Sequence, residues 1–306
     1  MRLKLGRPDI SRYADRFGVP AATDGLSVTF LGVASLLFDD GASAVLTDGF
    51  FSRPSLLTVG LRHIAPDDAR IDSVLRRAGI DRLDAVTPVH THFDHALDSA
   101  AVASRTGARL FGGESAVNIG RGGGLPEDQL ERVESGQQVK CGNFTLTFVN
   151  SSHCPPDRYP GVVSKPLVPP ARADAYRCGE AWSILVEHTS GQSALVQGSA
   201  GYVGGALDGL RADVAYLGVG QLGLHDEAYV TAYWTNTVRA VGARRVVVIH
   251  WDDFFRPLDQ PLRALPYAGD DLDASMRRID ALAAEDDVPV WFPTVWQRED
   301  PWAGLG

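Results

Sequence analysis

The feature that most constrains this chain is an eleven-residue stretch, PVHTHFDHALD, at positions 88–98. It holds three histidines and two aspartates and follows the apolar run DAVTPV, which is typical of a buried strand. In an extended segment, residues two positions apart point to the same side. His90 and His92 can therefore direct their imidazoles at one point, whereas Asp94 and His95 follow where the chain turns into a helix. One short stretch can thus supply ligands to two adjacent metal ions.

A purely structural interpretation makes Asp94 an N-terminal helix cap. Capping alone does not account for three histidines around one carboxylate, so metal binding is favoured. Two more histidines close apolar runs: His153 ends FTLTFVNSSH and His250 ends RRVVVIH. Either one alone would fit a hydrogen-bonded structural histidine. Together, at strand ends on the same edge as His90, they are candidates for further metal ligands.

Strand-like and helix-like segments alternate over most of the chain, which indicates an α/β fold built from two halves. We expect one domain over residues 1–306, in which 1–24 form a lead-in without a core of their own. Residues 154–181 contain six prolines and little periodicity. This segment is too long for an ordinary connection, so we expect a lid-like loop that lies between the two halves and covers the metal site.

Composition excludes several classes of protein. Of the 306 residues, 44% are hydrophobic and 22% charged, and the net charge is −9 without a basic stripe, so a nucleic-acid partner is not expected. Three cysteines form an odd and sparse set, which favours a reducing compartment over a disulfide framework. No run has the length of a membrane span, and the N-terminus has no signal-like apolar core. We therefore expect a cytoplasmic protein with no membrane partner, and a homo-oligomer is compatible with the sequence.

The order H-x-H-x-D-H, followed by one later strand-end histidine and a final one, resembles the metallo-β-lactamase-fold hydrolases. It looks most like the branch that contains L-ascorbate-6-phosphate lactonase and related phosphodiesterase-like proteins. The resemblance covers about residues 27–255. It implies a four-layer αβ/βα sandwich, in which two mixed sheets are flanked by helices and the metal site lies along one edge.

The resemblance also implies a set of ligands. The first metal ion would be held by His90, His92 and His153, and the second by Asp94, His95 and His250. Zn²⁺ is the expected ion, in one or two copies, and Mn²⁺ or Fe²⁺ would also suit such ligands. Asp48, in LTDGFFS, resembles the strand-end aspartate of the family, which would orient a ligand histidine. A plain turn residue before Gly49 remains an equal alternative for Asp48.

The sequence departs from the family at one position. Family members usually carry an aspartate that bridges both metal ions, but the matching stretch, SALVQGSAG, places Ser199 there. A neutral hydroxyl is a poor metal ligand, so we expect the second ion to bind weakly or to rely on another carboxylate. Asp252 and Asp253 in HWDDFF are candidates, although a solvated or helix-capping pair fits them as well.

The sequence thus predicts a metal-dependent hydrolase whose metal-bound hydroxide attacks a phosphodiester, lactone or other ester of a small molecule. Asp94 would orient the nucleophile, and His225 in VGQLGLHDE would contact the substrate or donate a proton, unless it is a surface loop histidine. One rival is a catalytically degenerate member that binds a metal or a metabolite, which Ser199 favours. A nucleic-acid-processing hydrolase is a second rival, which the acidic charge balance disfavours.

Overall fold

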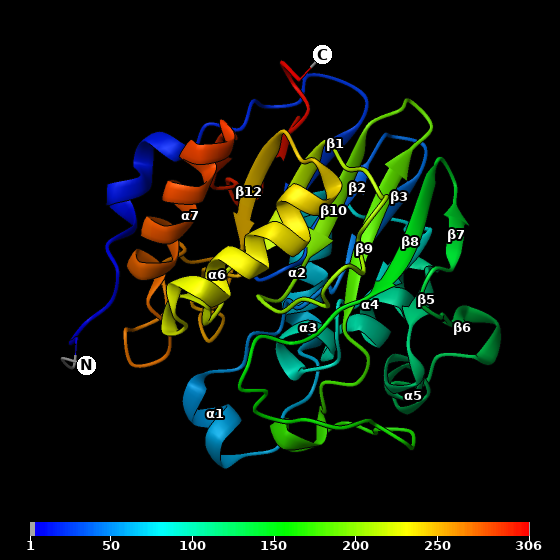
Figure 1. The fold of residues 1–306 in the computed structure, drawn as a ribbon. Helices are drawn as coiled ribbons and strands as arrows, with labels where there is room; N and C mark the ends of the chain where they lie inside the picture. Colours follow the sequence, from blue (N-terminus) through cyan, green and yellow to red (C-terminus); the bar gives the residue numbers. More distant parts are fainter. Residues whose placement is uncertain (1–3, 306) are drawn as a thin grey trace.

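Two seven-stranded sheets form the centre of the structure, a computed structural model that describes residues 4–305 (Figure 1). The first sheet has the order β14-β1-β2-β3-β4-β5-β6 and consists of β1 (Ser27–Phe30), β2 (Leu36–Asp39), β3 (Ala44–Thr47), β4 (Ala85–Thr87), β5 (Arg109–Gly112), β6 (Leu130–Arg132) and β14 (Arg298–Glu299). The second sheet has the order β13-β12-β11-β10-β9-β8-β7 and consists of β7 (Gln138–Cys141), β8 (Phe144–Asn150), β9 (Trp182–His188), β10 (Ser193–Gln197), β11 (Val214–Gly218), β12 (Arg245–Ile249) and β13 (Val290–Trp291).

The helices connect and cover these strands. The α-helices are α1 (Leu56–Leu61), α2 (Asp68–Ala78), α3 (Phe93–Ala96), α4 (Ser99–Thr106), α5 (Glu114–Gly122), α6 (Glu227–Trp234) and α7 (Leu272–Asp286). Shorter 3₁₀ segments are η1 (Ile10–Arg16), η2 (Glu127–Gln129), η3 (Ala173–Ala175) and η4 (Leu222–Leu224), and a π-helical segment, η5 (Thr235–Arg239), extends α6. Local signals set several ends: the Asp67 side chain caps the start of α2, and Gly79 ends it with a positive φ of 68°.

The two sheets have the same pattern of parallel and antiparallel strand pairing. In each, four strands pair antiparallel, and the last of these begins a run of parallel pairs: β3 to β6 in the first sheet and β10 to β13 in the second. The carboxyl ends of parallel strands meet at one edge of a sheet. Strands β3 and β4 therefore deliver Asp48 and the 88–98 stretch to the same edge, and β10 and β12 deliver Ser199 and His250. Strand β8 runs in the same direction as β10, because both are antiparallel to β9, and it delivers His153.

Apolar side chains of both sheets meet in one shared core. Phe30 and Phe38 of the first sheet and Phe148 of the second are at most 1% exposed and belong to the same cluster of buried residues. The rings of Phe38 and Tyr216 pack edge to face across the sheets with centroids 6.0 Å apart. This burial, at about 25 cal/mol per Å² of apolar surface, is what holds the sheets face to face.

Helices cover the outer face of each sheet. Helices α2 and α4 pack Ile71 and Val102 against Leu46 of β3 in a second buried cluster. Helices α6 and α7 extend the shared core on the other side through Trp234 and Ile279, and Figure 1 shows α6 in front of the second sheet and α7 to the left of β12. The result is a four-layer αβ/βα sandwich with two mixed sheets, which confirms the predicted fold class.

The proline-rich segment 154–181 lies differently from its prediction. It connects β8 to β9, two neighbours within the second sheet, and so does not lie between the halves of the chain. Polar and apolar residues alternate over 138–150, which is typical of antiparallel strands such as β7 and β8, but this pattern does not indicate which sheet they join. The proline-rich segment is anchored to the first half of the chain: Asn118 of α5 donates to the Val163 carbonyl at 2.8 Å, and Ile64, between α1 and α2, pairs with Ala171.

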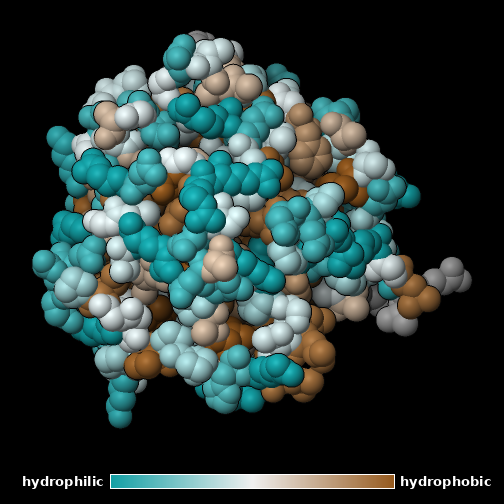
Figure 2. All heavy atoms as spheres, turned by 180° about the vertical axis from the view of Figure 1, so that it is seen from behind, coloured by the Kyte–Doolittle hydropathy of each residue, from teal (hydrophilic) through white to brown (hydrophobic). Residues whose placement is uncertain are grey.

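The lead-in packs onto the main core. Within its described part, Tyr13 of η1 and Phe17 stack on Phe292, each with centroids 5.3 Å apart. The face seen in Figure 2 is largely polar, with apolar side chains gathered toward its lower end, where α1 lies in Figure 1. None of the helices in residues 4–305 combines the length and apolar character that a membrane crossing requires. The three cysteines are all free and buried.

Candidate metal centre

The 88–98 stretch leaves β4 at the edge where the two sheets meet the helices. Strand β4 is short and fully buried, and Pro88 ends it. The backbone N–H of Val89 then donates to Asp48 Oδ1 at 2.9 Å, and the N–H of Thr91 donates to the Cys178 carbonyl at 2.8 Å. These two bonds fix the extended segment that carries His90 and His92, as the spacing of the histidines predicts.

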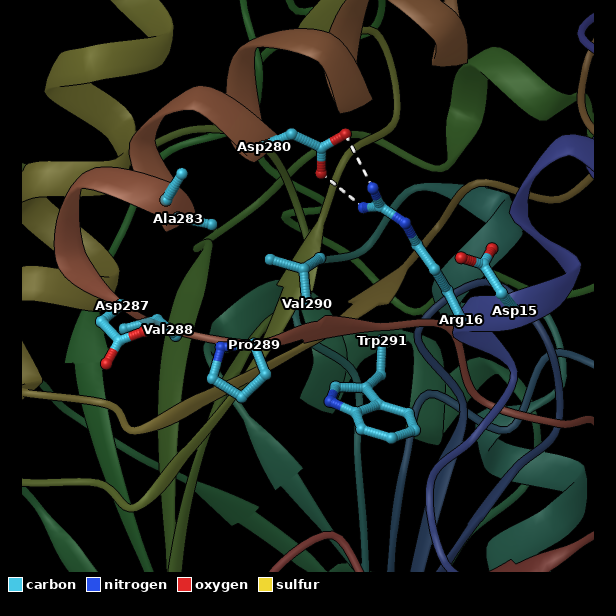
Figure 3. A pocket seen from close by; sticks show the side chains of 10 residues that line it. Asp15, Arg16, Asp280, Ala283, Asp287, Val288, Pro289, Val290 and Trp291 are labelled. Atoms are coloured by element: carbon cyan, nitrogen blue, oxygen red, sulfur yellow. Dashed lines mark hydrogen bonds and ion pairs between the residues drawn. The ribbon is translucent and has the colours of Figure 1, made fainter.

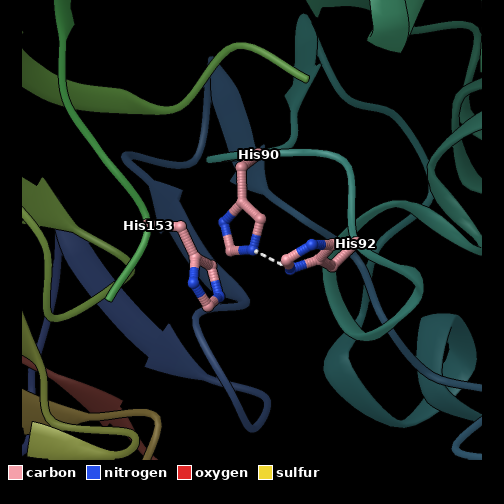
Figure 4. A group of neighbouring side chains, drawn as sticks. All are labelled: His90, His92 and His153. Atoms are coloured by element: carbon pink, nitrogen blue, oxygen red, sulfur yellow. Dashed lines mark hydrogen bonds between the residues drawn. The ribbon is translucent and has the colours of Figure 1, made fainter. Parts of the chain in front are cut away.

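Three histidines form the first group of potential ligands. His90, His92 and His153 each direct one ring nitrogen to a common point, with all three nitrogens within 4.8 Å of one another (Figure 4). His90 Nε2 and His92 Nδ1 are 3.1 Å apart. The three side chains follow the ends of β4 and β8. These two ends lie 63 positions apart along the chain, and the fold brings them together.

The second group consists of Asp94, His95 and His250, whose ligand atoms also lie within 4.8 Å of one another. Asp94 Oδ2 is 3.7 Å from His95 Nε2 and 3.6 Å from His250 Nε2, and the two ring nitrogens are 3.2 Å apart. His250 follows β12 with a positive φ of 57°, and its backbone N–H donates to the Val33 carbonyl at 2.7 Å. That turn directs the ring back toward α3.

Oxygen atoms lie close to the far ring nitrogens, an arrangement that suits a metal ion at the near ones. His92 Nε2 lies 3.1 Å from Asp157 Oδ1, His95 Nδ1 lies 2.7 Å from Asp48 Oδ2, and His153 Nδ1 lies 2.6 Å from the Cys154 carbonyl. When such a ring is neutral, the nearby oxygen holds the proton on the far nitrogen and leaves the near nitrogen with a bare lone pair. Burial acts to lower the pKa of His95, but the Asp48 and Asp94 carboxylates outweigh it and the pKa is raised. Bare nitrogens that face one another repel unless a cation lies between them. The residues present thus fit one divalent ion per group.

Burial favours the neutral, metal-binding form of the first group. It holds the pKa of His90 well below its ordinary value, and the neighbouring histidines add to this effect. Burial and the nearby His92 also lower the pKa of His153 to about 4. In the second group burial acts to raise the pKa of Asp94, but His95 and His250 outweigh it, and the pKa is lowered. The Asp94 carboxyl is therefore ionised at neutral pH.

Asp48 contacts a histidine of the second group. It is fully buried after β3 with a positive φ of 56°. One carboxylate oxygen accepts from the Val89 N–H and the other faces His95, so Asp48 positions both the 88–98 stretch and a ligand ring. The alternative of a plain turn residue does not account for either contact.

The structure places the two aspartates after His250 in ion pairs. Asp252 is fully buried, pairs with the buried Arg53 and accepts from the Val33 N–H at 2.9 Å. Both of its oxygens are therefore occupied behind His250, and Asp252 is neither solvated nor part of either histidine group. Asp253 pairs with Arg7 and Arg263 at 3.2 and 3.0 Å and lies at the wall of the cavity described below.

Ser199 and His225 lie on either side of Cys154. Ser199 follows β10, is 8% exposed, and accepts from the Cys154 N–H at 3.0 Å. His225 Nε2 is 3.3 Å from Cys154 Sγ, and its ring stacks on Tyr229 with centroids 4.1 Å apart. Burial raises the pKa of the Cys154 thiol to about 12, so Cys154 is not a thiolate at neutral pH. The catalytic role expected of His225 stays a prediction.

Asp157 is a residue of this centre that sequence reasoning missed. It comes from the proline-rich segment, and together with His92 and Cys178 it forms a third cluster of potential ligands within 4.8 Å. Its contact with His92 is that of a carboxylate which orients a ligand ring. The sequence signal was present, since Asp157 follows His153 by four positions, but an irregular loop gives no direction to its side chains.

A cavity of about 580 Å³ opens onto both groups. Its wall includes Asp94, His153, Ser199 and His250, so a small molecule inside can reach the first and the second group together. A larger cavity, of about 650 Å³, lies apart from the histidines between η1, α7 and β13 (Figure 3). Its Arg16 is already paired with Asp280, at 3.0 Å for one of the two hydrogen bonds, and its described lining holds no histidine. The smaller cavity is therefore the candidate site.

Comparison with curated proteins finds relatives over part of the chain. A UPF0173 metal-dependent hydrolase of Myxococcus xanthus is 29% identical over 150 residues, which are 48% of this chain and 47% of that protein. A UPF0173 metal-dependent hydrolase of Rhizobium leguminosarum is 28% identical over 130 residues, which are 42% of this chain and 48% of that protein. The chain thus spans about half the length of the curated relatives it matches. No family model matches the chain.

Solved structures resemble the chain over most of its length. The metallo-β-lactamase fold protein YhfI of Bacillus subtilis matches with a TM-score of 0.50 and 14% identity, over 91% of this chain and 98% of that one. The diiron β-hydroxylase CmlA of Streptomyces venezuelae matches with a TM-score of 0.52 and 12% identity, over 89% of this chain and 53% of that one. At such low identity the likeness concerns architecture alone, and together with the two mixed sheets flanked by helices it shows that this chain has the metallo-β-lactamase fold.

Proposed function

We propose that this chain is a metal-dependent hydrolase that cleaves a phosphodiester, a lactone or another ester of a small molecule. The observation that carries the proposal is that both groups of potential ligands face one cavity, with Asp94, His153 and His250 in its wall. A substrate held there would lie against both groups at once. The volume of the cavity, about 580 Å³, suits a small molecule. We therefore propose a small-molecule substrate in place of a nucleic acid or another macromolecule.

His90, His92 and His153 would hold one ion, and Asp94, His95 and His250 the other. A divalent ion bound here supplies a Lewis acid and lowers the pKa of a water molecule. Asp48 fixes the His95 ring through the contact of 2.7 Å, and Asp157 fixes His92 through the contact of 3.1 Å. The ionised Asp94 carboxylate is placed to orient the attacking water and accept its proton.

The relatives support the proposal in general terms. The two curated proteins are described as metal-dependent hydrolases, although each match covers about half of the relative. We propose Zn²⁺ as the ion, since neutral imidazole and carboxylate are ligands that zinc prefers in catalytic sites. The diiron enzyme CmlA has the same fold, so iron and manganese belong in the test. Membership of the L-ascorbate-6-phosphate lactonase-like branch is a proposal of the same kind.

A second candidate function is a catalytically degenerate protein that binds a metal ion or a metabolite. Ser199 favours it, because this neutral side chain lines the cavity beside His153 and His250 and already accepts a hydrogen bond from the Cys154 N–H. A serine in this position brings no negative charge between two ions.

A substrate panel separates the two functions. The chain would be purified without chelator and assayed against a phosphodiester, a phosphomonoester, a lactone and a carboxylic ester, with Zn²⁺, Mn²⁺ or Fe²⁺ added after removal of metal. A hydrolase is expected to turn over at least one class only when metal is restored, and His250→Ala should abolish that turnover. Stoichiometric metal binding without turnover of any class would favour the degenerate protein and contradict a hydrolase acting on esters.

A further inference from the structure

The cavity beside the histidines has a positive wall, although the chain as a whole carries a net charge of −9. Arg7, Arg158 and Arg263 line it, against two carboxylates, Asp94 and Asp253. With neutral histidines, three positive and two negative charges leave the wall positive even before any metal ion is counted. A concave site of this sign in an acidic protein attracts anions.

The three arginines keep hydrogen-bond donors free. Arg7 and Arg263 converge on the same oxygen, Asp253 Oδ2, at 3.2 and 3.0 Å. Arg263 uses Nε and Nη2 for this contact, so its Nη1 donors find no acceptor among the described residues. Arg158 is exposed on the proline-rich segment and has no ion pair within residues 4–305. Each guanidinium has five N–H donors, so these groups can bind an oxyanion without giving up Asp253.

Another part of the wall is apolar. The rings of Phe254 and Phe255 lie with centroids 4.5 Å apart and their planes tilted by 41°, and Leu265 and Pro266 also line this part. The Phe254 ring also lies edge-on to His250 with centroids 5.8 Å apart, so the apolar side begins next to the second group of ligands. An aromatic or aliphatic body of a ligand would be buried there, at about 25 cal/mol per Å².

We propose that the cavity binds a small amphipathic oxyanion, with a phosphate, phosphonate or carboxylate group on the arginines and an apolar body on the two phenylalanines. This rests on the proposed function only in taking the histidine groups as the reacting end of the site. The substrate of the chain would then be an ester that carries both a negative charge and an apolar group.

Binding of a non-hydrolysable probe tests the proposal without turnover. The full chain, at matched metal content, would be titrated calorimetrically with 1-naphthylmethylphosphonate. Methylphosphonate tests the anion without the apolar body, 1-naphthylmethanol the apolar body without the charge, and 1-naphthylacetate the carboxylate in place of the phosphonate. We expect a naphthyl anion to bind at least about tenfold more tightly than either half alone. Equal affinity for the whole probe and one of its halves would overturn the proposal.

Arginine variants locate the binding. Arg158→Gln or Arg263→Gln should lower the affinity for the naphthyl anion by about fivefold to tenfold, the loss expected for one charge-assisted hydrogen bond. The affinity for 1-naphthylmethanol should not change. Arg172→Gln, on the same proline-rich segment but outside the cavity wall, is the matched control. If both cavity variants bind the anion as tightly as the control does, the site is not there. Tight binding combined with absence of turnover would contradict the hydrolase and leave this inference standing.

Discussion

At the scale of single residues, we predict that Ser199 limits how many ions the centre holds. Two divalent ions about 4 Å apart repel by roughly 16 kcal/mol at an effective dielectric of 20, four times the value for unit charges. Asp94 is the one carboxylate in the two groups that face the cavity, so little negative charge offsets that repulsion. The second ion should consequently bind more weakly than the first.

The corresponding prediction is that Ser199→Asp raises the metal content from nearer one ion per chain toward two. The new carboxylate would lie beside His153 and His250, where it attracts both ions, and it keeps an oxygen to accept from the Cys154 N–H. Elemental analysis at matched free metal measures the change. Ser199→Asn is the control, since it has the same shape without the charge. A wild type that already holds two tightly bound ions would contradict the argument.

The sequence predicts both ligand groups because their residues follow strands whose direction is readable. His90, His92 and His250 each come directly after an apolar run, and the strand ends meet at one edge. It could not predict Asp157, which reaches His92 from an irregular segment. Nor could it predict the burial of Asp252, because the partner Arg53 lies about 200 positions away and only the folded chain brings the two together.

At the scale of elements, the proline-rich segment contacts His92, a potential metal ligand, as well as bordering the cavity. Asp157 lies 3.1 Å from His92 Nε2, and the Cys178 carbonyl ties the segment to the 88–98 stretch by accepting from the Thr91 N–H at 2.8 Å. A shift of the segment would therefore move Asp157 and, through it, change the orientation of the His92 ring. Whether it also opens as a lid stays a prediction.

We predict that Asp157→Asn weakens metal binding by about tenfold, the lower end of the range for losing a carboxylate that orients a ligand histidine. An amide accepts more weakly than a carboxylate, and it can present its N–H₂ to the ring. Competition with a chromophoric chelator gives the affinity. Asp174→Asn, at a half-buried position of the same segment outside both histidine groups, is the matched control. Equal affinities of the two variants would mean that the segment does not support His92.

Helix α5 shows why some elements escape prediction. Its end falls in the stretch GRGGGL, from Gly120, whose composition predicts a flexible turn. In the structure Gly120 is helical and buried, because the absence of a side chain lets α5 approach β6: a Cβ there would lie 2.4 Å from Leu130 Cδ2. This glycine serves close packing, a property that depends on an element distant from the local pattern.

At the scale of the whole molecule, β14 closes the first sheet with a buried carboxyl group. Glu299 is 1% exposed, pairs with Val28 of β1, and accepts from the Thr294 N–H at 2.7 Å. Burial raises the pKa of Glu299 to about 8. The folded chain therefore keeps a proton that the unfolded chain loses above its ordinary pKa, and stability falls as pH rises from about 4.5 to 8.

Glu299→Gln should remove this dependence. Each pKa unit corresponds to about 1.4 kcal/mol, so the free energy of unfolding of the wild type should fall by a few kcal/mol more than that of the variant over this range. Urea unfolding at pH 5 and pH 8 measures it. Glu285→Gln, an exposed position at the end of α7, should behave like the wild type. Parallel pH profiles for wild type and Glu299→Gln would show that Glu299 is ionised in the folded chain.

The central claim is that two sheets with the same strand pairing bring His90, His92 and His153 together to hold a metal ion. Elemental analysis combined with metal affinity, for wild type and His92→Ala at low free Zn²⁺, tests it most directly. His188→Ala is the control, since His188 pairs with Asp40 at 2.9 Å outside both ligand groups. We predict at least one ion per wild-type chain, retention of that ion in His188→Ala, and at least tenfold weaker binding in His92→Ala, since loss of a ligand should exceed the roughly tenfold loss from a supporting residue. A wild type without bound metal, or a His92→Ala chain that keeps its full content, would contradict the account.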